Sequence, residues 1–334
     1  RQVNNMQASA KATNPARANE RRPRASGGFS TLYRKELADH FHSARFKLLF
    51  ILLILTSLAS LYGALAGLMG SDSSEYIFLS MYTTSGSSIP SFASFLAYLT
   101  PLVGLALGFD AINRERSQGT LNRLVSQPIH RDAVINAKFL AGATVILLMI
   151  FFVGIMVGAL GLVAIGVPPT GEELLRLFSY LLLTAFYTML WLGISILCSV
   201  LCKHAATAAL IVIALWIYLT VFASMVASVI ANLCYPLDGI EGYYNMLNNY
   251  QLELNLQRTS PYYLYSEAAT TLLNPDVRFI GFTTTSALSG ALAGYLSFEQ
   301  SVMLVWPHLT CMVALVLLSF TVSYIVFMRQ EIRA

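Results

Sequence analysis

Six long runs of apolar side chains set the limits on what this chain can fold into. About 20 consecutive apolar residues suffice for an α-helix to cross the hydrocarbon core of a bilayer. Helices satisfy their own backbone hydrogen bonds there, so they are the natural spanning form. We therefore predict an all-α integral membrane protein with six transmembrane helices. The apolar runs cover about 48–69, 92–112, 134–167, 174–201, 205–233 and 302–328.

The charge content of the chain supports a lipid environment. Charged residues make up 11% of the sequence and hydrophobic residues 56%, with a mean hydropathy of +0.62. Soluble domains carry about 25% charged residues. A chain with so little charge cannot cover a soluble surface, so the bilayer is an expected partner.

The positions of the basic residues predict the orientation, because cytoplasmic loops of membrane proteins collect Lys and Arg. With the N-terminus in the cytoplasm, the inner side holds the N-terminal tail, the 113–138 connection, the turn at Lys203 and the C-terminus. Of the 21 lysines and arginines, only Arg176, Arg258 and Arg278 then lie outside. Both termini are predicted to be cytoplasmic, in agreement with an even number of spans.

The N-terminal region divides into two parts. Residues 1–28 are rich in Arg, Asn, Ala and Ser and have no apolar core, so we predict a disordered cytoplasmic tail and not a signal peptide. Residues 29–45 place an aromatic or Leu residue at every fourth position, which predicts an amphipathic helix along the inner interface. A plain anchoring helix without a mechanical role is the alternative. The periodic residues are Phe29, Tyr33, Leu37 and Phe41.

The 113–133 connection contains a short predicted helix between the helix breakers Gly119 and Pro128. Its apolar stripe consists of Leu121, Leu124 and Val125. Exposed apolar residues on a cytoplasmic helix favour docking into a groove of a partner. The alternative is packing against the helix ends of the chain itself.

The outer connection, 234–299, is rich in Tyr, Asn and Leu. Its final part, 281–298, is apolar with many Ser and Thr residues, which is compatible with a re-entrant or interfacial helix. His308 lies inside the last apolar run, where a hydrogen-bonded structural role and a functional role are both open.

The sequence lacks three common motifs of ATPases, metalloproteases and serine hydrolases. There is no GxxxxGK[ST] phosphate loop, no HExxH and no GxSxG. We expect no catalytic residues and no ATP hydrolysis by this chain alone. Cys198, Cys202 and His204 are spaced for either a soft metal ion or two apolar cysteines on one membrane helix, and we expect no metal.

Three stretches of the sequence resemble a known family. They are YRKELADHF (33–41), ALGFDAINRERSQGTLNRLVSQPIHRDAVINAKF (106–139) and LLNP (272–275). The chain looks like an ABC-2 type permease, the membrane subunit of an ATP-binding-cassette exporter with the type V exporter fold. Within that family it most resembles the permeases of Nos-type transporters, which are linked to maturation of nitrous oxide reductase. The resemblance in topology covers about 29–330, and 46–330 would form the transmembrane domain.

The resemblance implies roles for two groups of residues. The segment 119–127 would be the coupling helix that sits on the ATPase, preceded by a charged pair, and the predicted coupling residues are Glu115, Arg116, Gly119, Leu121, Leu124, Val125 and Gln127. The second and fifth apolar runs would face the dimer axis and form the pathway. The predicted pathway residues are Phe95, Tyr98, Leu102, Thr220, Ser224 and Ser228. From spacing alone, the last three share a helix face and are either polar path residues or small packing residues.

The resemblance also implies partners and a mechanism. Two copies of a cytosolic ABC ATPase, holding ATP and Mg, would join two copies of this permease in a prokaryotic cytoplasmic membrane, with no cofactor in this chain and no nucleic acid. The substrate would move outward by alternating access. Two alternatives stay open: a mechanical transmitter that acts on an extracytoplasmic partner, and a membrane scaffold with no ATPase. The stretch 234–280 is longer than expected for a Nos-type permease, so no substrate is carried over.

Overall fold

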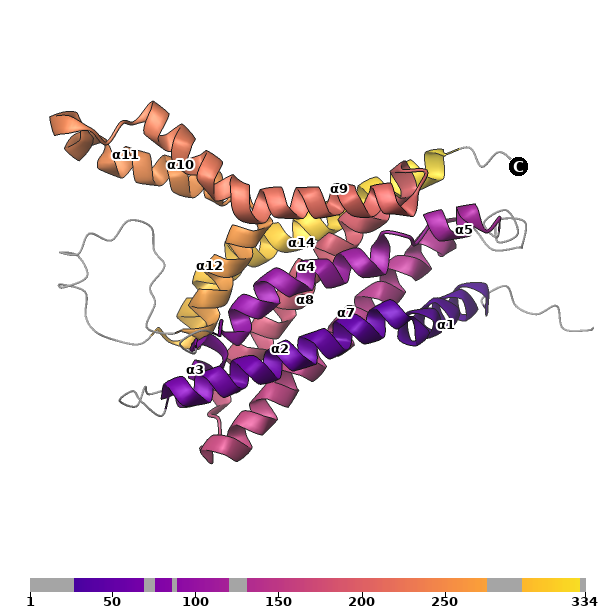
Figure 1. The fold of residues 1–334 in the computed structure, drawn as a ribbon, viewed down its shortest axis with the longest axis horizontal. Coiled ribbons are helices and arrows are strands. Elements are labelled where there is room, and N and C mark those ends of the chain that lie inside the picture. The colour runs from indigo at the N-terminus through magenta and orange to yellow at the C-terminus, as the bar shows by residue number, and fades with distance from the viewer. Residues whose placement is uncertain (1–26, 69–75, 86–88, 120–130, 275–295, 331–334) are drawn as a thin grey trace, which may run out of the picture.

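A computed structural model of the chain describes residues 27–68, 76–85, 89–119, 131–274 and 296–330 (Figure 1). Within these ranges the chain folds into helices. In chain order they are α1 (Gly27–His42), α2 (Ala44–Leu68), α3 (Ile77–Thr83), α4 (Phe92–Gly108), α5 (Asn113–Ser117), α7 (Arg131–Ile165), α8 (Gly171–Leu201), α9 (Ala205–Ile217), the π-helical turn η2 (Tyr218–Phe222), α10 (Ala223–Cys234), α11 (Gly239–Gln257), α12 (Pro261–Leu273) and α14 (Phe298–Arg329).

The prediction of an all-α fold with six membrane spans is confirmed. In the described part of the chain, 6 helices are long and apolar enough to cross a membrane. We call them spans one to six: Ala44–Leu68, Phe92–Ser117, Arg131–Ile165, Gly171–Leu201, Ala205–Cys234 and Phe298–Arg329. Each agrees within a few residues with one of the apolar runs.

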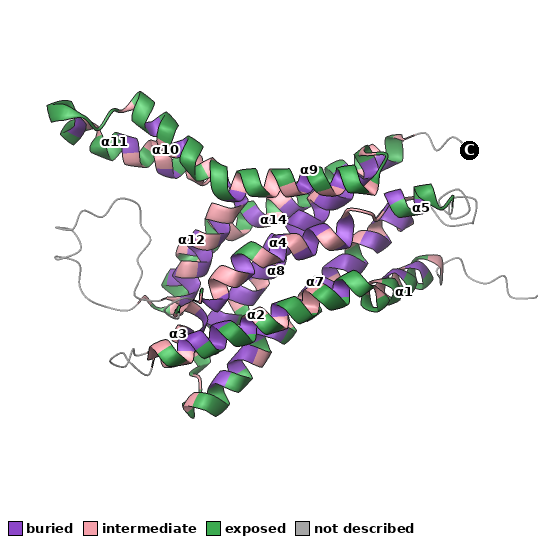
Figure 2. Ribbon diagram, viewed as in Figure 1, coloured by how far each residue is buried: buried purple, intermediate pink, exposed green. Residues whose placement is uncertain are grey.

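Span four, α8, is the central helix of the bundle. It packs against both α4 and α14, and most of its residues are buried (Figure 2). Its start is fixed by a capping box, in which Thr170 and Glu173 bond each other's backbone N–H groups. Gly104 of α4 lets the two helices touch, since a Cβ there would lie 2.5 Å from the Thr188 carbonyl oxygen.

Span five differs from the other spans in both burial and shape. Of the apolar stretch that would cross the membrane, only 11% is buried inside the described structure in span five, against 78% in span four. Its middle is the π-helical turn η2, which separates α9 from α10. Extra residues in a helical turn bend the axis, and α10 departs from the line of α9 at this turn (Figure 1).

The outer connection contains two helices that the sequence did not suggest. α11 returns antiparallel along α10, and Ser260, just before α12, donates a hydrogen bond to the Leu219 carbonyl midway along span five. α12 then runs back through the bundle with most of its residues buried. The chain therefore re-enters the depth of the spans between 239 and 273. The segment predicted to do so, 281–298, lies mostly outside the described residues.

The opposite end of the molecule carries α1, α5 and the C-terminal end of α14 (Figure 1). The helix predicted over 29–45 is divided at Ser43 into the end of α1 and the start of α2. Leu32 and Glu36 form the buried side of α1, while Phe29 and Phe41 are exposed. The exposed aromatic pair suits an interfacial position, which stays a prediction because no membrane is present. The tail before Gly27 lies outside the described residues.

Candidate functional site

A buried ion cluster joins three helices at the α1 end of the molecule. The Lys138 ammonium of α7 lies 3.0 Å from the Glu36 carboxylate of α1 and 2.8 Å from the Glu115 carboxylate of α5. All three side chains are at least nine-tenths buried. Lys35 adds a weaker contact of 3.3 Å to Glu36 from the exposed side. One cation therefore ties the predicted interfacial helix to the helix that precedes the predicted coupling segment.

The charges in this cluster set the ionisation of Glu36. Burial alone would raise the pKa of its carboxyl, but the charges and hydrogen bonds of Lys138 and Lys35 outweigh that effect and hold the pKa below its ordinary value. Glu36 is therefore a carboxylate in the folded protein. Nearby on α1, burial lowers the pKa of His40, which favours the neutral imidazole.

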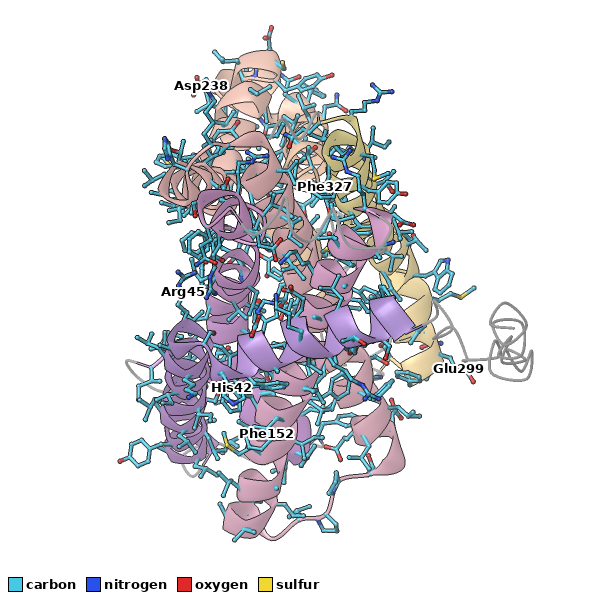
Figure 3. All side chains as sticks on the ribbon, turned by 90° about the vertical axis from the view of Figure 1, so that its right-hand side faces the viewer. His42, Arg45, Phe152, Asp238, Glu299 and Phe327 are labelled. Atoms are coloured by element: carbon cyan, nitrogen blue, oxygen red, sulfur yellow. The ribbon has the colours of Figure 1, made fainter. Side chains whose placement is uncertain are left out.

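The start of α5 is held by backbone contacts as well. The Ser199 hydroxyl of α8 accepts hydrogen bonds from the N–H groups of Ile112 and Asn113 at 3.1 and 3.2 Å. Just before them, Asp110 forms an ion pair with Arg45, whose guanidinium also covers the Phe109 ring at 4.8 Å. Arg45 and His42 are labelled in Figure 3, which views the molecule from this end. The chain from Asp110 to Ser117 is thus fixed to spans one and four.

Gln330, at the end of α14, links the two chain segments that flank 120–130. Its side-chain oxygen accepts a hydrogen bond from Arg116 at 2.8 Å, and its backbone carbonyl accepts one from Arg131 at 3.0 Å. Its side-chain nitrogen, Nε2, donates a hydrogen bond to the Val200 carbonyl of α8 at 2.8 Å. Arg116 and Arg131, which flank the predicted coupling segment, therefore meet on one glutamine. We call the residues joined by these contacts the coupling platform: Glu36, Glu115, Arg116, Arg131, Lys138 and Gln330.

The predicted coupling residues fall into two groups. Glu115 is buried in the coupling platform, Arg116 is exposed and bonds Gln330, and Gly119 has the positive φ of 65° that favours glycine. The other four predicted coupling residues lie outside the described residues, so their docking role stays a prediction. They are Leu121, Leu124, Val125 and Gln127.

The predicted pathway residues of span two lie on α4. Phe95 and Leu102 are partly buried, and Tyr98 is exposed. The Tyr98 hydroxyl accepts a hydrogen bond from the Tyr262 hydroxyl of α12 at 3.0 Å, and the two rings lie 5.4 Å apart. A helix from the outer connection therefore reaches the proposed path.

The predicted pathway residues of span five do not share one environment. Thr220 is buried and its hydroxyl has no partner among the described residues, whereas Ser224 is exposed. Ser228 bonds Glu253 of α11. The π-helical turn shifts the helical phase between Thr220 and α10, so a spacing of four no longer puts Thr220 on one face with the two serines. Their role in a pathway stays a prediction.

A second ionic group joins the predicted outer connection to α14. The Glu267 carboxylate of α12 binds the Arg258 guanidinium and lies 2.9 Å from Nε2 of His308 on α14. Arg176 of α8, fully buried, donates to the Leu272 carbonyl and to Ser301, so it joins α8, α12 and the start of α14. The hydrogen-bonded structural interpretation of His308 matches this geometry.

Sequence reasoning missed the members of the coupling platform that lie outside the 113–133 connection. Glu36 and Lys138 lie within the stretches that carry the family resemblance, but neither was assigned a role, although a lysine within a long apolar run needs a buried partner. Gln330 had no local signal. Of the proposed metal-ligand candidates, Cys198 is buried and Cys202 is partly buried, and no group of three or more potential ligands occurs among the described residues.

Known proteins provide an independent comparison. Residues 30–332 match the sequence model of a family described as ABC-2 family transporter protein. Two curated relatives carry the description probable ABC transporter permease protein NosY. The chain is 31% identical over 137 residues to the Pseudomonas aeruginosa protein, covering 40% of this chain and 46% of the relative. It is 33% identical over 148 residues to the Stutzerimonas stutzeri protein, covering 43% and 48%. The chain thus spans about half the length of these relatives.

Proposed function

The chain belongs to the ABC-2 family of transporter proteins, and on that premise we propose that it is the membrane-spanning permease subunit of an ATP-binding-cassette exporter. The relatives NosY carry the description permease, and the family match extends over nearly all of this chain. The sequence has no phosphate loop, so a separate cytosolic ATPase supplies the energy. Two ATPases pair with two copies of this chain.

The coupling platform is the observation that carries this proposal. A segment that transmits force needs firmly held attachment points, and the described residues on either side of 120–130 are bonded to the spans. Arg116 and Arg131 meet on Gln330, and Glu115 is held by the buried Lys138. A displacement of the segment between Arg116 and Arg131 is therefore transmitted directly to α7, α8 and α14.

The mechanism is alternating access. Closure of the ATPase dimer pushes on 119–127, and the platform carries that movement into spans three, four and six. A ligand or partner can shift a conformational equilibrium only by contacts that differ between the states. The stripe Leu121, Leu124 and Val125 supplies those contacts, and the route opens outward between spans two and five.

A second candidate function is a mechanical transmitter that acts on an extracytoplasmic partner without moving a solute. The observation that favours it is the contact of α12 with both α4 and η2, which fills the outer space between spans two and five. If that contact never opened, the movement would still reach α10 and α11.

Replacement of the stripe tests the coupling role. Leu121→Asp with Leu124→Asp places two charges in an apolar contact, where each costs several kcal/mol unless it finds a partner. We expect the ATPase subunit to be lost when the double variant is purified through a tag on this chain in mild detergent.

The matched control is Leu237→Asp, an exposed leucine on the outer side. It should leave the ATPase bound and the yield of the chain unchanged. Equal recovery of the ATPase with the double variant and with the control would show that 119–127 is not the docking site.

A further inference from the structure

The start of α5 is capped by a side chain from another helix. The first N–H groups of an α-helix have no partner within the helix, and a side chain next to them usually accepts their hydrogen bonds. Ser91, Thr170 and Ser297 do this for α4, α8 and α14. The N-cap residue of α5 is Ile112, whose side chain cannot accept a bond. The buried Ser199 hydroxyl of span four takes that role, so the cap also fixes α5 to span four.

Asn113, the residue after Ile112, has a side chain that suits the cap but does not form it. Asparagine is among the most favourable N-cap residues, and isoleucine is among the least. The carboxamide of Asn113 is buried, and neither its oxygen nor its nitrogen has a hydrogen-bond partner among the described residues. A buried polar group without a partner lowers stability. This conformation of α5 therefore carries a cost that a different helix start would remove.

A shift of the helix start by one residue is enough. With Asn113 as the N-cap, its side-chain oxygen accepts a bond from the backbone N–H two or three residues later. Its own N–H and that of Ile112 are then released from Ser199, whose hydroxyl is able to bond a carbonyl of its own helix. Glu115 keeps its ion pair with Lys138 during this shift, because the lysine ammonium lies at the end of a flexible four-carbon stem.

We propose that α5 has two alternative caps and that the exchange between them controls its attachment to span four. With Ser199 as the cap, α5 is bonded to span four, as in this structure. With Asn113 as the cap, α5 is released from span four and stays bonded to span three through Glu115. Closure of the ATPase dimer favours the second state because it displaces the segment that follows α5. Asn113 and Ser199 are thus positioning residues for coupling, and this inference rests on the proposed function for the source of the displacement.

Amide hydrogen exchange of a peptide covering 109–118 tests the exchange of caps, because it reports the N–H bonds directly. In the purified chain, Ser199→Ala should speed exchange of this peptide and Asn113→Leu should slow it, since each variant removes one of the caps. Asn113→Leu should also raise the midpoint of thermal unfolding, because an apolar side chain replaces a buried polar group that has no partner. Asn113→Ser, which keeps a good N-cap residue, should exchange like the unmodified chain.

The complex with the ATPase tests the link to ATP. Trapping of ATP with vanadate should speed exchange of the same peptide about fivefold, the factor expected for one ordinary hydrogen bond. Asn113→Leu should abolish that response. Ser60→Ala is the matched control, because the Ser60 hydroxyl of span one is also buried without a partner among the described residues. It should leave the response to ATP unchanged.

The outcomes separate this inference from the proposed function. A lower unfolding midpoint for Asn113→Leu, or exchange in that purified variant as fast as in the unmodified chain, overturns the two-cap exchange even if the ATPase co-purifies. A response to ATP that is missing from the unmodified complex, or that persists in Asn113→Leu, overturns the role of the caps in coupling. The expected exchange of the purified variants with no ATPase ever bound supports the two caps and contradicts the proposed function.

Discussion

Lys138 shows how a single buried charge can hold several helices together at one end of the bundle. Its ammonium group lies between two carboxylates from different helices, and all three side chains are withdrawn from solvent. Removing the cation would leave two carboxylates facing each other in a poorly polarisable site. The folded-state pKa of Glu36 lies below its ordinary value of 4.5. The ionised carboxylate of Glu36 therefore stabilises the fold above pH 4.5, and this stabilisation is lost as the pH falls through the folded-state pKa.

We therefore expect Lys138→Met to destabilise the protein strongly. Breaking one partner out of a buried ion group typically costs about 3–5 kcal/mol. The measurement is the midpoint of thermal unfolding in detergent at neutral pH. Lys35→Met is the matched control, because Lys35 is half exposed and a surface pair contributes at most about 1 kcal/mol. Coincident unfolding curves for the two variants would show that the cluster carries no stability.

At the scale of elements, the sequence predicts apolar helices well and polar ones poorly. The six spans follow from hydrophobic length alone, so they were found with nearly correct ends. α11 and α12 are rich in Tyr, Asn and Thr, and the burial of α12 depends on partners such as Tyr187 and Arg176 that lie far away in sequence. Likewise Glu115 was predicted from a motif, but its partner Lys138 becomes visible only once α5 and α7 are packed together.

Packing between α4 and α8 gives a prediction for a single methyl group. Gly104→Ala places a Cβ 2.5 Å from the Thr188 carbonyl oxygen and 2.9 Å from the Leu192 nitrogen, both backbone atoms of the central helix. Overpacking of this kind costs about 1–3 kcal/mol, so the unfolding midpoint should fall.

Gly171→Ala serves as the comparison, since a Cβ at Gly171 meets no atom within 4 Å. It should unfold like the unmodified protein. A Gly104→Ala protein that did the same would mean that α4 and α8 are further apart in the membrane than in this structure.

At the scale of the whole molecule, the ionic groups are divided between the two ends of the bundle. The coupling platform lies at the end with α1 and the C-terminus, and the Arg258–Glu267–His308 group lies toward the end with α11 and α12 (Figure 1). Span four connects the ends as a buried rod with Arg176 near its start and Ser199 near its finish. The positive-inside pattern predicts that the platform lies in the cytoplasm, and orientation experiments can test that prediction directly.

Labelling from one side of the membrane checks that orientation. Ser117→Cys, exposed on α5, should resist an impermeant maleimide in intact cells and react after the cells are opened. Tyr243→Cys, exposed on α11, should react in intact cells. The reverse pattern would put the 113–133 connection on the side without nucleotide and end the case for coupling to a cytosolic ATPase.

Gln330 also has a practical consequence for laboratory work on this protein. It lies at the last described turn, where two arginines and a carbonyl of span four hold it in place. A fluorescent protein or affinity tag fused close behind it would be carried to the same spot that the ATPase is expected to occupy. Reporters fused there without a long flexible spacer should therefore weaken assembly.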